Sequence, residues 1–238
     1  MRQRPSKKEP AKIVTVSASF GMDCLLYGET ELTDRGKIIG VTGGIACGKS
    51  VVCRFFAQKG AFIIDLDQVG HQLLQNTSSV FGQLLSTFGT TILDGDGKIN
   101  RSKLGEVVFT DPEARKQLDA IMHPVILQES RHSAHQFVEG NPDRIAMIDS
   151  PLLIEVNGYE TVDLVIVVIT DVHTQKQRLI KRSHDQKRPI NCHQVEARIK
   201  AQLPLSEKVK YADFVIDNSG TVDNLKSKVD ELWRILTR

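Results

Sequence analysis

Five short apolar runs alternate along the chain with longer stretches that have a helical pattern. These runs, rich in branched aliphatic residues, cover residues 37–43, 61–67, 144–149, 162–170 and 214–218. Short runs with few charges predict strands that are buried on both faces. Buried strands separated by helices are typical of a parallel sheet covered by helices. The pattern therefore predicts an α/β fold with a five-stranded parallel sheet.

The stretch between the second and third runs is long and mainly helical. A helix is predicted to begin at Asp111-Pro112-Glu113, because Asp111 is a suitable N-cap and the next two residues suit a first turn. His123-Pro124 predicts an interruption, since the residue before a proline is biased away from helical geometry. A second helix is expected to follow and to include Phe137. Residues 68–142 thus form an insertion in the sheet pattern, which is the expected place for a helical substrate lobe.

The remaining chain divides into a sheet core, a polar insertion and an N-terminal extension. We expect the core to comprise residues 37–67, 143–181 and 205–238. Residues 182–204 are rich in lysine, arginine and histidine, and they are expected to form a lid. Residues 1–36 are mainly polar and are expected to be partly disordered, with a short strand within residues 12–21.

The composition excludes several classes of function. The 238 residues carry a net charge of only +2 and 5% aromatic residues, which argues against nucleic-acid binding. The longest strongly apolar run, Leu164–Ile169, is too short to cross a bilayer, so no membrane partner is expected. The four cysteines form no C-x-x-C pair and no cluster with zinc-ligand spacing. Scattered thiols favour a reducing compartment, and the cytoplasm is the expected location.

The clearest motif is a phosphate-binding loop between the first predicted strand and a helix expected to begin near Lys49. Gly43-x-x-x-x-Gly48-Lys49-Ser50 matches the pattern G-x-x-x-x-G-K-[ST] in this strand–helix context. The glycines allow backbone N–H groups to converge on phosphate oxygens, and the helix N-terminus adds a favourable dipole. Lys49 can reach the β- and γ-phosphates, and the Ser50 hydroxyl can ligate Mg²⁺. The residues expected to bind the nucleotide are Gly43, Gly44, Ile45, Ala46, Cys47, Gly48, Lys49, Ser50 and Val51.

Three residues in and just after the loop bear on how well it binds. Ala46 and Cys47 occupy positions where the backbone does the binding, so neither is expected to abolish it. Cys47 is either an inert filler or a redox-sensitive thiol, because the helix dipole would lower its pKa and bound phosphates would raise it. Val51 cannot donate a hydrogen bond, and the missing hydroxyl contact is expected to cost roughly 1 kcal/mol of nucleotide binding.

Other motifs separate the classes of phosphate-loop protein. The chain has no N-K-x-D motif, with which GTPases bind the base. The run at 144–149 ends in Asp149-Ser150-Pro151, whereas motor and transporter ATPases usually end this strand in Asp-Glu. Of these classes of phosphate-loop protein, the sequence therefore favours a small-molecule kinase. Such a kinase has a substrate lobe and a lid inserted into its core.

Several segments occur in an order that points to one kinase family. IIGVTGGIACGKS is followed by IIDLDQVGH, and then by FGTTILDGDGKINRSKLGEVVF, LDAIMHPVI, DSPLLIE, TQKQRLIKR and ADFVIDNSG. From about Lys37 to the C-terminus the chain resembles dephospho-coenzyme A kinase. The resemblance implies that residues 37–238 are a kinase domain whose partners are ATP, Mg²⁺ and dephospho-CoA. The implied reaction phosphorylates the ribose 3′-hydroxyl of dephospho-CoA, the last step of CoA biosynthesis.

The resemblance also implies roles on the acceptor side. Asp67 lies at the carboxyl end of a predicted strand, where parallel sheets bind ligands, and it resembles the family's proposed general base. Asp65, expected on the same strand face, would support it or hold a metal-bound water; alternatively, both acids cap the following helix. His71, where the family often has arginine, either touches the acceptor or is a surface residue. Arg101 corresponds to a substrate-lobe motif, and His123 either contacts the acceptor or caps a helix end.

Four further positions are implied to act on ATP. Arg178 and Arg182 are four residues apart, so they share one helix face and can clamp the phosphates as the lid closes; a solvated basic face is the alternative. Asp149 can hold a magnesium-bound water, or it can pack against PLLIE. Asn218 follows the last predicted strand, near where the family places adenine, or it belongs to a plain turn.

Two other functions stay open at this point. One is a phosphate-loop kinase for another small molecule, such as a nucleoside, a nucleotide or a sugar acid. The other is a nucleotide-binding regulator without turnover. Retention of Asp67 and the arginines argues against the regulator, whereas Val51 is a point in its favour.

Overall fold

The described residues form two compact units, one from those within 1–63 and 137–238 and the other from those within 64–136. The computed structural model describes residues 14–15, 35–75, 79–185 and 189–238. Most of the predicted N-terminal extension, and its predicted disorder, therefore lies outside the described residues.

The first unit is built on a sheet with the strand order β1-β6-β5-β2-β4-β3. β2 pairs in parallel with β5 and β4, and β6 pairs in parallel with β5 and β1. All five predicted strands are present, which confirms the α/β fold, and β1 lies where a short N-terminal strand was expected. The strands are β1 (Val14–Thr15), β2 (Lys37–Gly43), β3 (Phe62–Asp65), β4 (Ile145–Asp149), β5 (Leu164–Ile169) and β6 (Phe214–Asp217).

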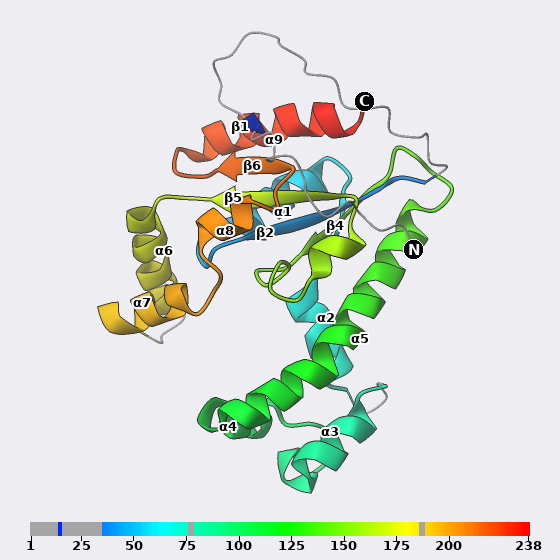
Figure 1. Cartoon of the computed structure of the whole chain (residues 1–238), viewed down its shortest axis with the longest axis vertical. Helices are drawn as coiled ribbons and strands as arrows, with labels where there is room; N and C mark the ends of the chain where they lie inside the picture. The colour runs from blue at the N-terminus through cyan, green and yellow to red at the C-terminus, as the bar shows by residue number, and fades with distance from the viewer. Residues whose placement is uncertain (1–13, 16–34, 76–78, 186–188) are drawn as a thin grey trace. The chain divides into compact units, whose positions relative to one another are not determined.

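β2 lies between β4 and β5, so both neighbours bring residues to its carboxyl end (Figure 1). Val41 of β2 is opposite Asp149, and Gly43 is opposite Val168. Parallel strands end at the same edge of a sheet, and ligands of open α/β sheets bind at that edge. The phosphate-loop motif and Asp149 are therefore neighbours, although about a hundred residues separate them in the sequence.

Helices α1 (Lys49–Gln58) and α9 (Val222–Leu236) pack on one face of this sheet. Alternate residues of the central strands point to that face, so Ile39 and Ile166 are fully buried with Phe56 of α1. Each such side chain contributes roughly 1.5–3 kcal/mol through the hydrophobic effect. This packing fixes α1, and with it the loop that precedes α1.

β3 differs from its prediction in burial and in length. A fully buried strand was predicted over residues 61–67, but β3 is the last strand in the sheet order and Phe62 is 40% exposed. The strand ends at Asp65 because the Asp65 carboxylate accepts hydrogen bonds from the N–H groups of Asp67 and Gln68. Helix capping therefore ends the strand two residues early and places Asp67 in a helix.

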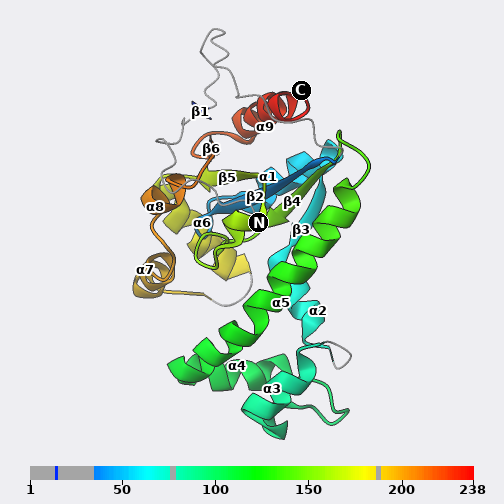
Figure 2. The ribbon, with the colours of Figure 1, turned by 45° about the vertical axis from the view of Figure 1, so that its right-hand side comes forward.

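The second unit, residues 64–136, is mainly helical (Figure 2) and has its own apolar core. Its buried members are Val80, Leu84, Ile92, Ile99, Leu104 and Met122. The unit contains α2 (Leu66–Leu73), α3 (Phe81–Phe88), the short 3₁₀ helix η1 (Thr90–Ile92), α4 (Arg101–Thr110) and most of α5 (Pro112–Val138). This unit falls largely within the predicted insertion at residues 68–142.

Helix α5 is continuous, so the predicted interruption at His123-Pro124 is wrong. The predicted start is correct, since the Asp111 carboxylate accepts a hydrogen bond from the Glu113 N–H. Because Pro124 has no N–H group, the helical hydrogen bond to the carbonyl of Ala120 is missing. Both Pro124 and Ala120 are exposed, so water can hydrate that carbonyl and the helix continues.

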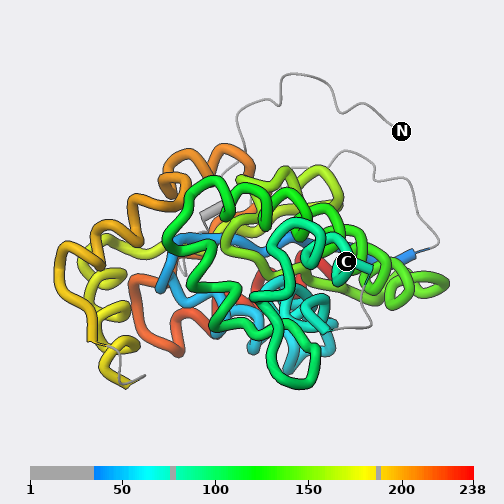
Figure 3. Tube along the Cα trace, turned by 90° about the horizontal axis from the view of Figure 1, so that it is seen from below, coloured from blue at the N-terminus to red at the C-terminus, as the bar shows by residue number. Residues whose placement is uncertain are grey.

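Three further helices follow β5 in the first unit: α6 (Val172–Asp185), α7 (Cys192–Lys200) and α8 (Leu205–Val209). Asn191 and Gln194 form a capping box at the start of α7. α6 and α7 lie side by side (Figure 3). An ion pair of 2.6 Å between Lys176 and Glu196 joins them. The predicted lid, residues 182–204, thus contains the end of α6 and all of α7.

Among the described residues, the helices are all too short or too polar to span a bilayer.

Candidate active site

The phosphate-loop motif forms a tight turn between β2 and α1. Ala46 and Gly48 have positive φ angles of 60° and 87°, and the Cys47 N–H donates to the Gly44 carbonyl. Within the described part of the chain, no side chain caps the N-terminus of α1. The first N–H groups of a helix are unpaired within the helix, so this end of α1 is suited to bind an anion.

Gly48 meets two separate requirements of the loop. Its φ of 87° is a conformation that residues with a Cβ rarely adopt. A Cβ at this position would also lie only 2.0 Å from Nδ2 of Asn218. Glycine is therefore required here both by the backbone conformation and by the neighbouring side chain.

Three amide side chains hold the backbone of the loop. The Ile45 N–H donates to Oε1 of Gln202 at 2.7 Å, and the Ile45 carbonyl accepts from Nε2 of Gln175 at 2.6 Å. Nδ2 of Asn218 donates to the Cys47 carbonyl at 2.8 Å. Sequence reasoning missed Gln175, because a single glutamine on a helix belongs to no motif. Asn218 was expected near the adenine or in a plain turn, and its contact with the loop backbone was not predicted.

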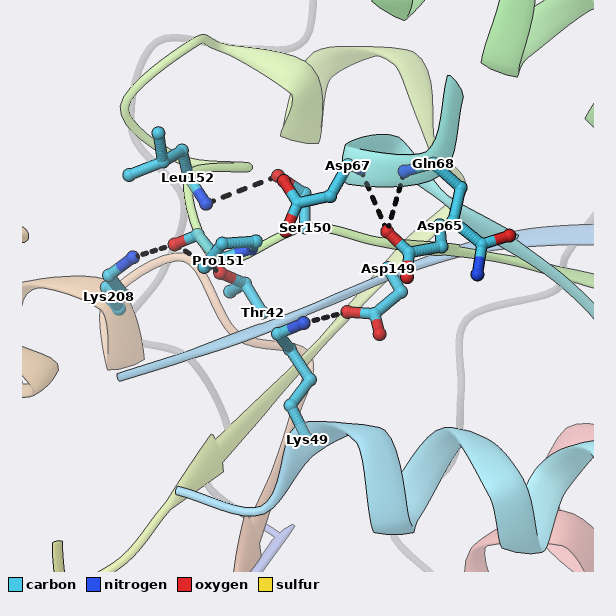
Figure 4. Close-up of polar contacts among 10 residues, drawn as sticks. All are labelled: Thr42, Lys49, Asp65, Asp67, Gln68, Asp149, Ser150, Pro151, Leu152 and Lys208. Atoms are coloured by element: carbon cyan, nitrogen blue, oxygen red, sulfur yellow. Dashed lines mark hydrogen bonds and ion pairs between the residues drawn. The ribbon is translucent and has the colours of Figure 1, made fainter. Parts of the chain in front are cut away.

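Lys49 forms an ion pair with Asp149 at the carboxyl ends of β2 and β4 (Figure 4). The two side chains are only 14% and 8% exposed. The parallel register of β2 and β4 brings these residues together, which sequence spacing alone does not predict. This ion pair holds the Lys49 side chain beside the phosphate loop.

The residues near Lys49 fit a magnesium ion. Mg²⁺ is usually held by one or two protein oxygens together with substrate phosphates and water. Ser50 is exposed at the start of α1, and Asp149 provides a carboxylate beside Lys49. No three His, Cys, Asp or Glu side chains gather as a metal cage within the described ranges, and such a magnesium site does not require one.

Arg178 of α6 reaches the loop with a buried donor that has no hydrogen-bond partner among the residues that the structure describes. Its Nη2 atom donates to the Asn218 carbonyl at 3.0 Å. Its Nη1 atom is buried without a hydrogen-bond partner and lies 3.6 Å from the position of a Cβ on Gly48. A buried cationic donor without a partner is costly, and a phosphate oxygen would satisfy it. Arg182, one turn further along α6, is exposed.

The Cys47 thiol is fully buried within the loop. Burial raises its pKa above the ordinary value, outweighing hydrogen bonds from backbone N–H groups and the charges of Arg178 and Lys208, which lower it. The reactive thiolate is therefore disfavoured at neutral pH. Of the two alternatives for Cys47, the structure favours the inert filler.

Lys208 of α8 supports the segment that follows Asp149. Its side chain is fully buried and donates to the Pro151 carbonyl (Figure 4). It also forms an ion pair with Glu155 at 2.8 Å. The hydroxyl of Thr42, the residue before Gly43, also donates to the Pro151 carbonyl, at 3.3 Å. The turn after β4 is thereby tied to β2 and to α8.

In the second unit, Asp65 and Asp67 have different surroundings. Oδ1 of Asp65 accepts hydrogen bonds from the N–H groups of Asp67 and Gln68, at 2.8 and 3.3 Å. Asp65 is the N-cap of α2, so the expectation that both acids share a strand face is wrong. Asp67 does not cap this helix; it is exposed on the first turn of α2, where its carboxylate is accessible to a ligand.

Asp67 and His71 line a cavity of about 290 Å³ within the second unit. Its other walls are apolar: Leu66, Gly70, Leu74, Leu104, Leu118, Met122 and Ile126. Nη2 of Arg101 lies 2.7 Å from Nε2 of His71. A guanidinium group can only donate, so Nε2 of His71 accepts and its proton resides on Nδ1. The structure thus brings together three of the predicted acceptor residues.

His123, which was also predicted to contact the acceptor, does not lie with Asp67, His71 and Arg101. It lies within α5, and its Nε2 atom is 3.6 Å from a carboxylate oxygen of Asp119, one turn earlier. The alternative that His123 caps a helix end is wrong, because α5 does not end there. His123 is also absent from the walls of the cavity.

Comparison with known proteins covers most of the chain. The family model described as dephospho-CoA kinase matches residues 37–224. The chain is 37% identical over 202 residues to "Dephospho-CoA kinase" of Aquifex aeolicus, covering 85% of this chain and 98% of that protein.

Solved structures agree with this match. A crystal structure of a Thermus thermophilus protein has a TM-score of 0.69 and 27% identity, covering 85% of this chain and 99% of that chain. A structure entitled "Dephospho-CoA kinase from Campylobacter jejuni" has a TM-score of 0.64 and 27% identity, covering 84% of this chain and 96% of that chain. The residues matched by the family model include the phosphate loop, Asp67 and both arginines of α6.

Proposed function

The chain belongs to the dephospho-CoA kinase family, and from this premise we propose which of its residues transfer the phosphoryl group. It is a kinase that phosphorylates the ribose 3′-hydroxyl of dephospho-CoA with ATP as the donor, in CoA biosynthesis. The other acceptors and the regulator without turnover are therefore set aside. The roles of the individual residues are our proposal.

On the donor side, the loop at residues 43–50 and Val51 bind the ATP phosphates. The observation that carries this assignment is the Nη1 atom of Arg178, a buried cationic donor beside Gly48 that has no partner in the described ranges. A phosphate on the uncapped N-terminus of α1 would satisfy this donor. Lys49 neutralises charge on the transferring group, and Arg182 adds to the clamp when ATP is bound.

Ser50 and Asp149 would hold Mg²⁺ when ATP is bound. The ion supplies charge neutralisation on the β- and γ-phosphates. Lys49 pairs with Asp149 in the structure, and it can bind a phosphate oxygen instead when the nucleotide is present. Asp65 is a weaker candidate for the metal, because one of its oxygens already accepts two backbone hydrogen bonds.

On the acceptor side, the helical lobe binds dephospho-CoA and Asp67 acts as the general base. Asp67 is exposed at the rim of the cavity and does not cap a helix, so its carboxylate can accept the proton of the 3′-hydroxyl. His71 and Arg101 provide polar contacts at the same cavity, and its apolar walls accommodate an apolar part of the acceptor. Residues 182–204 act as the lid over the ATP phosphates.

The cytoplasm remains our proposed location. This proposal rests on the scattered cysteines of the sequence, which favour a reducing compartment.

The test of this function is ADP release from Mg·ATP in the presence of dephospho-CoA. Adenosine, nucleoside monophosphates and gluconate serve as competing acceptors, and a reaction with EDTA measures the metal requirement. We expect turnover with dephospho-CoA and loss of turnover with EDTA. Turnover of another acceptor, but not of dephospho-CoA, would contradict the function.

Asp67→Asn tests the role of the base. It is expected to lower kcat about 100-fold or more and to leave ATP affinity within about twofold, because general base catalysis contributes roughly 10²–10⁴-fold. Asp96→Asn is the matched control, since Asp96 is another exposed aspartate of the same unit. Equal kcat values for the two variants would exclude Asp67 as the base.

A further inference from the structure

The peptide groups of Ile45 are held on both sides by glutamine side chains. Gln202 accepts the N–H of Ile45 at 2.7 Å, and Gln175 donates to its carbonyl at 2.6 Å. Ile45 lies directly before Ala46, the first residue of the loop with a positive φ. Fixing both polar groups of Ile45 therefore fixes the direction in which the loop turns towards the helix N-terminus.

In the sequence, Gln175 lies before the predicted lid, and Gln202 lies near the C-terminal end of the lid. Gln175 belongs to the first turns of α6, and Gln202 follows α7 by two residues. The Lys176–Glu196 ion pair joins α6 to α7 between them. The chain that enters the lid and the chain that leaves it are thus both tied to one residue of the phosphate loop.

The surroundings of the two glutamines are shaped to accommodate their hydrogen bonds to Ile45. Gln175 is only 3% exposed although its side chain is polar. A Cβ on Gly44 would lie 2.7 Å from Nε2 of Gln175, so the glycine leaves room for this amide. The residue after Gln202, Leu203, donates its N–H to Glu155 at 3.1 Å, which anchors the exit from the lid a second time.

We propose that Gln175 and Gln202 are positioning residues that hold the phosphate loop in its ATP-binding conformation through Ile45 and connect that conformation to both ends of the lid. The proposal rests on the assignment of residues 43–50 to ATP. Neither glutamine needs to touch the nucleotide. Each lowers the cost of ordering the loop, so its removal weakens ATP binding and leaves dephospho-CoA binding unchanged.

One glutamine accepts a hydrogen bond from Ile45 and the other donates one to it. The same substitution by glutamate therefore has opposite expected effects at the two positions. Gln202 acts as an acceptor, so Gln202→Glu keeps the bond while Gln202→Met removes it. Gln175 acts as a donor, so Gln175→Glu loses the bond and adds repulsion to the Ile45 carbonyl. The two glutamate variants carry the same added charge, so a difference between them reports on the bond rather than on charge near the phosphates.

The measurements are KM for each substrate, ATP affinity by calorimetry, and the exchange rate of the Ile45 amide proton in protein labelled with ¹⁵N-isoleucine. We expect KM for ATP to rise about three- to tenfold in Gln202→Met, in Gln175→Met and in Gln175→Glu, which is the effect of one lost hydrogen bond. KM for ATP in Gln202→Glu is expected to stay within about twofold of the wild type. Exchange of the Ile45 amide should be about fivefold faster in Gln202→Met but not in Gln202→Glu.

Gln177→Met is the matched control, because Gln177 is exposed on the same helix and contacts His173 of that helix. It should leave both KM values and the Ile45 exchange rate unchanged. Equal effects of Gln202→Glu and Gln175→Glu would overturn the proposal, and so would equal losses for ATP and dephospho-CoA in the methionine variants. Calorimetry and amide exchange need no acceptor, so they test the proposal even if dephospho-CoA proves not to be the substrate.

Discussion

Replacing the buried lysine of α8 offers a direct test of how the turn after β4 is held. Lys208 has no exposed surface, whereas the side chain of its partner Glu155 is 23% exposed. We therefore expect two variants that break the same ion pair, Lys208→Met and Glu155→Leu, to differ in cost. Each removes one partner and leaves the other in its place.

The magnitudes follow from what each variant leaves behind. Removing one partner of a buried ion pair costs about 3–5 kcal/mol, chiefly because the other charge stays buried. In Glu155→Leu the remaining charge is the fully buried ammonium of Lys208, so we expect the free energy of unfolding to fall by about 3–5 kcal/mol. In Lys208→Met the carboxylate is partly hydrated and keeps the Leu203 N–H, and the Pro151 carbonyl keeps the Thr42 hydroxyl. We therefore expect Lys208→Met to lower the free energy of unfolding by only about 2–3 kcal/mol.

Urea unfolding measured by the fluorescence of Trp233 is a suitable assay, since this is the chain's single tryptophan and it lies in α9 of the same unit. The double variant should cost clearly less than the sum of the two single variants, because it removes both charges together. Additive costs, or a larger cost for Lys208→Met than for Glu155→Leu, would refute the reasoning. A changed m-value would show that the denatured state had changed instead.

Three further predictions concern other parts of the structure. Arg178→Lys is expected to raise the Kd for ATP about tenfold by calorimetry, because lysine cannot bond both the Asn218 carbonyl and a phosphate in a fixed fork. Pro124→Ala is expected to stabilise the second unit by roughly 1–3 kcal/mol in urea unfolding followed by circular dichroism, since it restores a backbone hydrogen bond within α5. Cys47 is expected to react with a thiol reagent much more slowly than the exposed Cys192, because burial raises the pKa of Cys47; the difference should narrow at alkaline pH.

Each of these predictions has an outcome that contradicts it. ATP affinity unchanged by Arg178→Lys would exclude the buried donor from phosphate binding, and Lys181→Arg, at an exposed position of the same helix, is the control. Loss of stability in Pro124→Ala would mean that the proline contributes contacts beyond its backbone geometry. Equal labelling rates for the two cysteines would contradict the burial of Cys47.

The sheet and the phosphate loop could be predicted because their signals are local. Short apolar runs and the spacing of Gly43, Gly48 and Lys49 are contiguous in sequence, so they require no knowledge of long-range contacts. The Lys49–Asp149 pair has no local signal, because it depends on the register between β2 and β4.

The errors arose where two local rules compete. At Pro124 the missing backbone donor favoured an interruption, but exposure of the freed carbonyl allows the helix to continue. At Asp65 the apolar run favoured a longer strand, whereas the carboxylate caps a helix. Gln175 and Gln202 needed the folded structure, because they reach Ile45 from positions more than a hundred residues away in sequence.

The contact between Gly48 and Asn218 bears on how this loop can evolve. A side chain at position 48 would collide with the carboxamide of Asn218, and removing that carboxamide would leave the Cys47 carbonyl without its donor. A change at either position is therefore harmful while the other is retained. Even a paired change would still face the positive φ of position 48. Gly48 and Asn218 are therefore expected to be retained together. A functional replacement would require a different backbone turn between β2 and α1, not a single substitution.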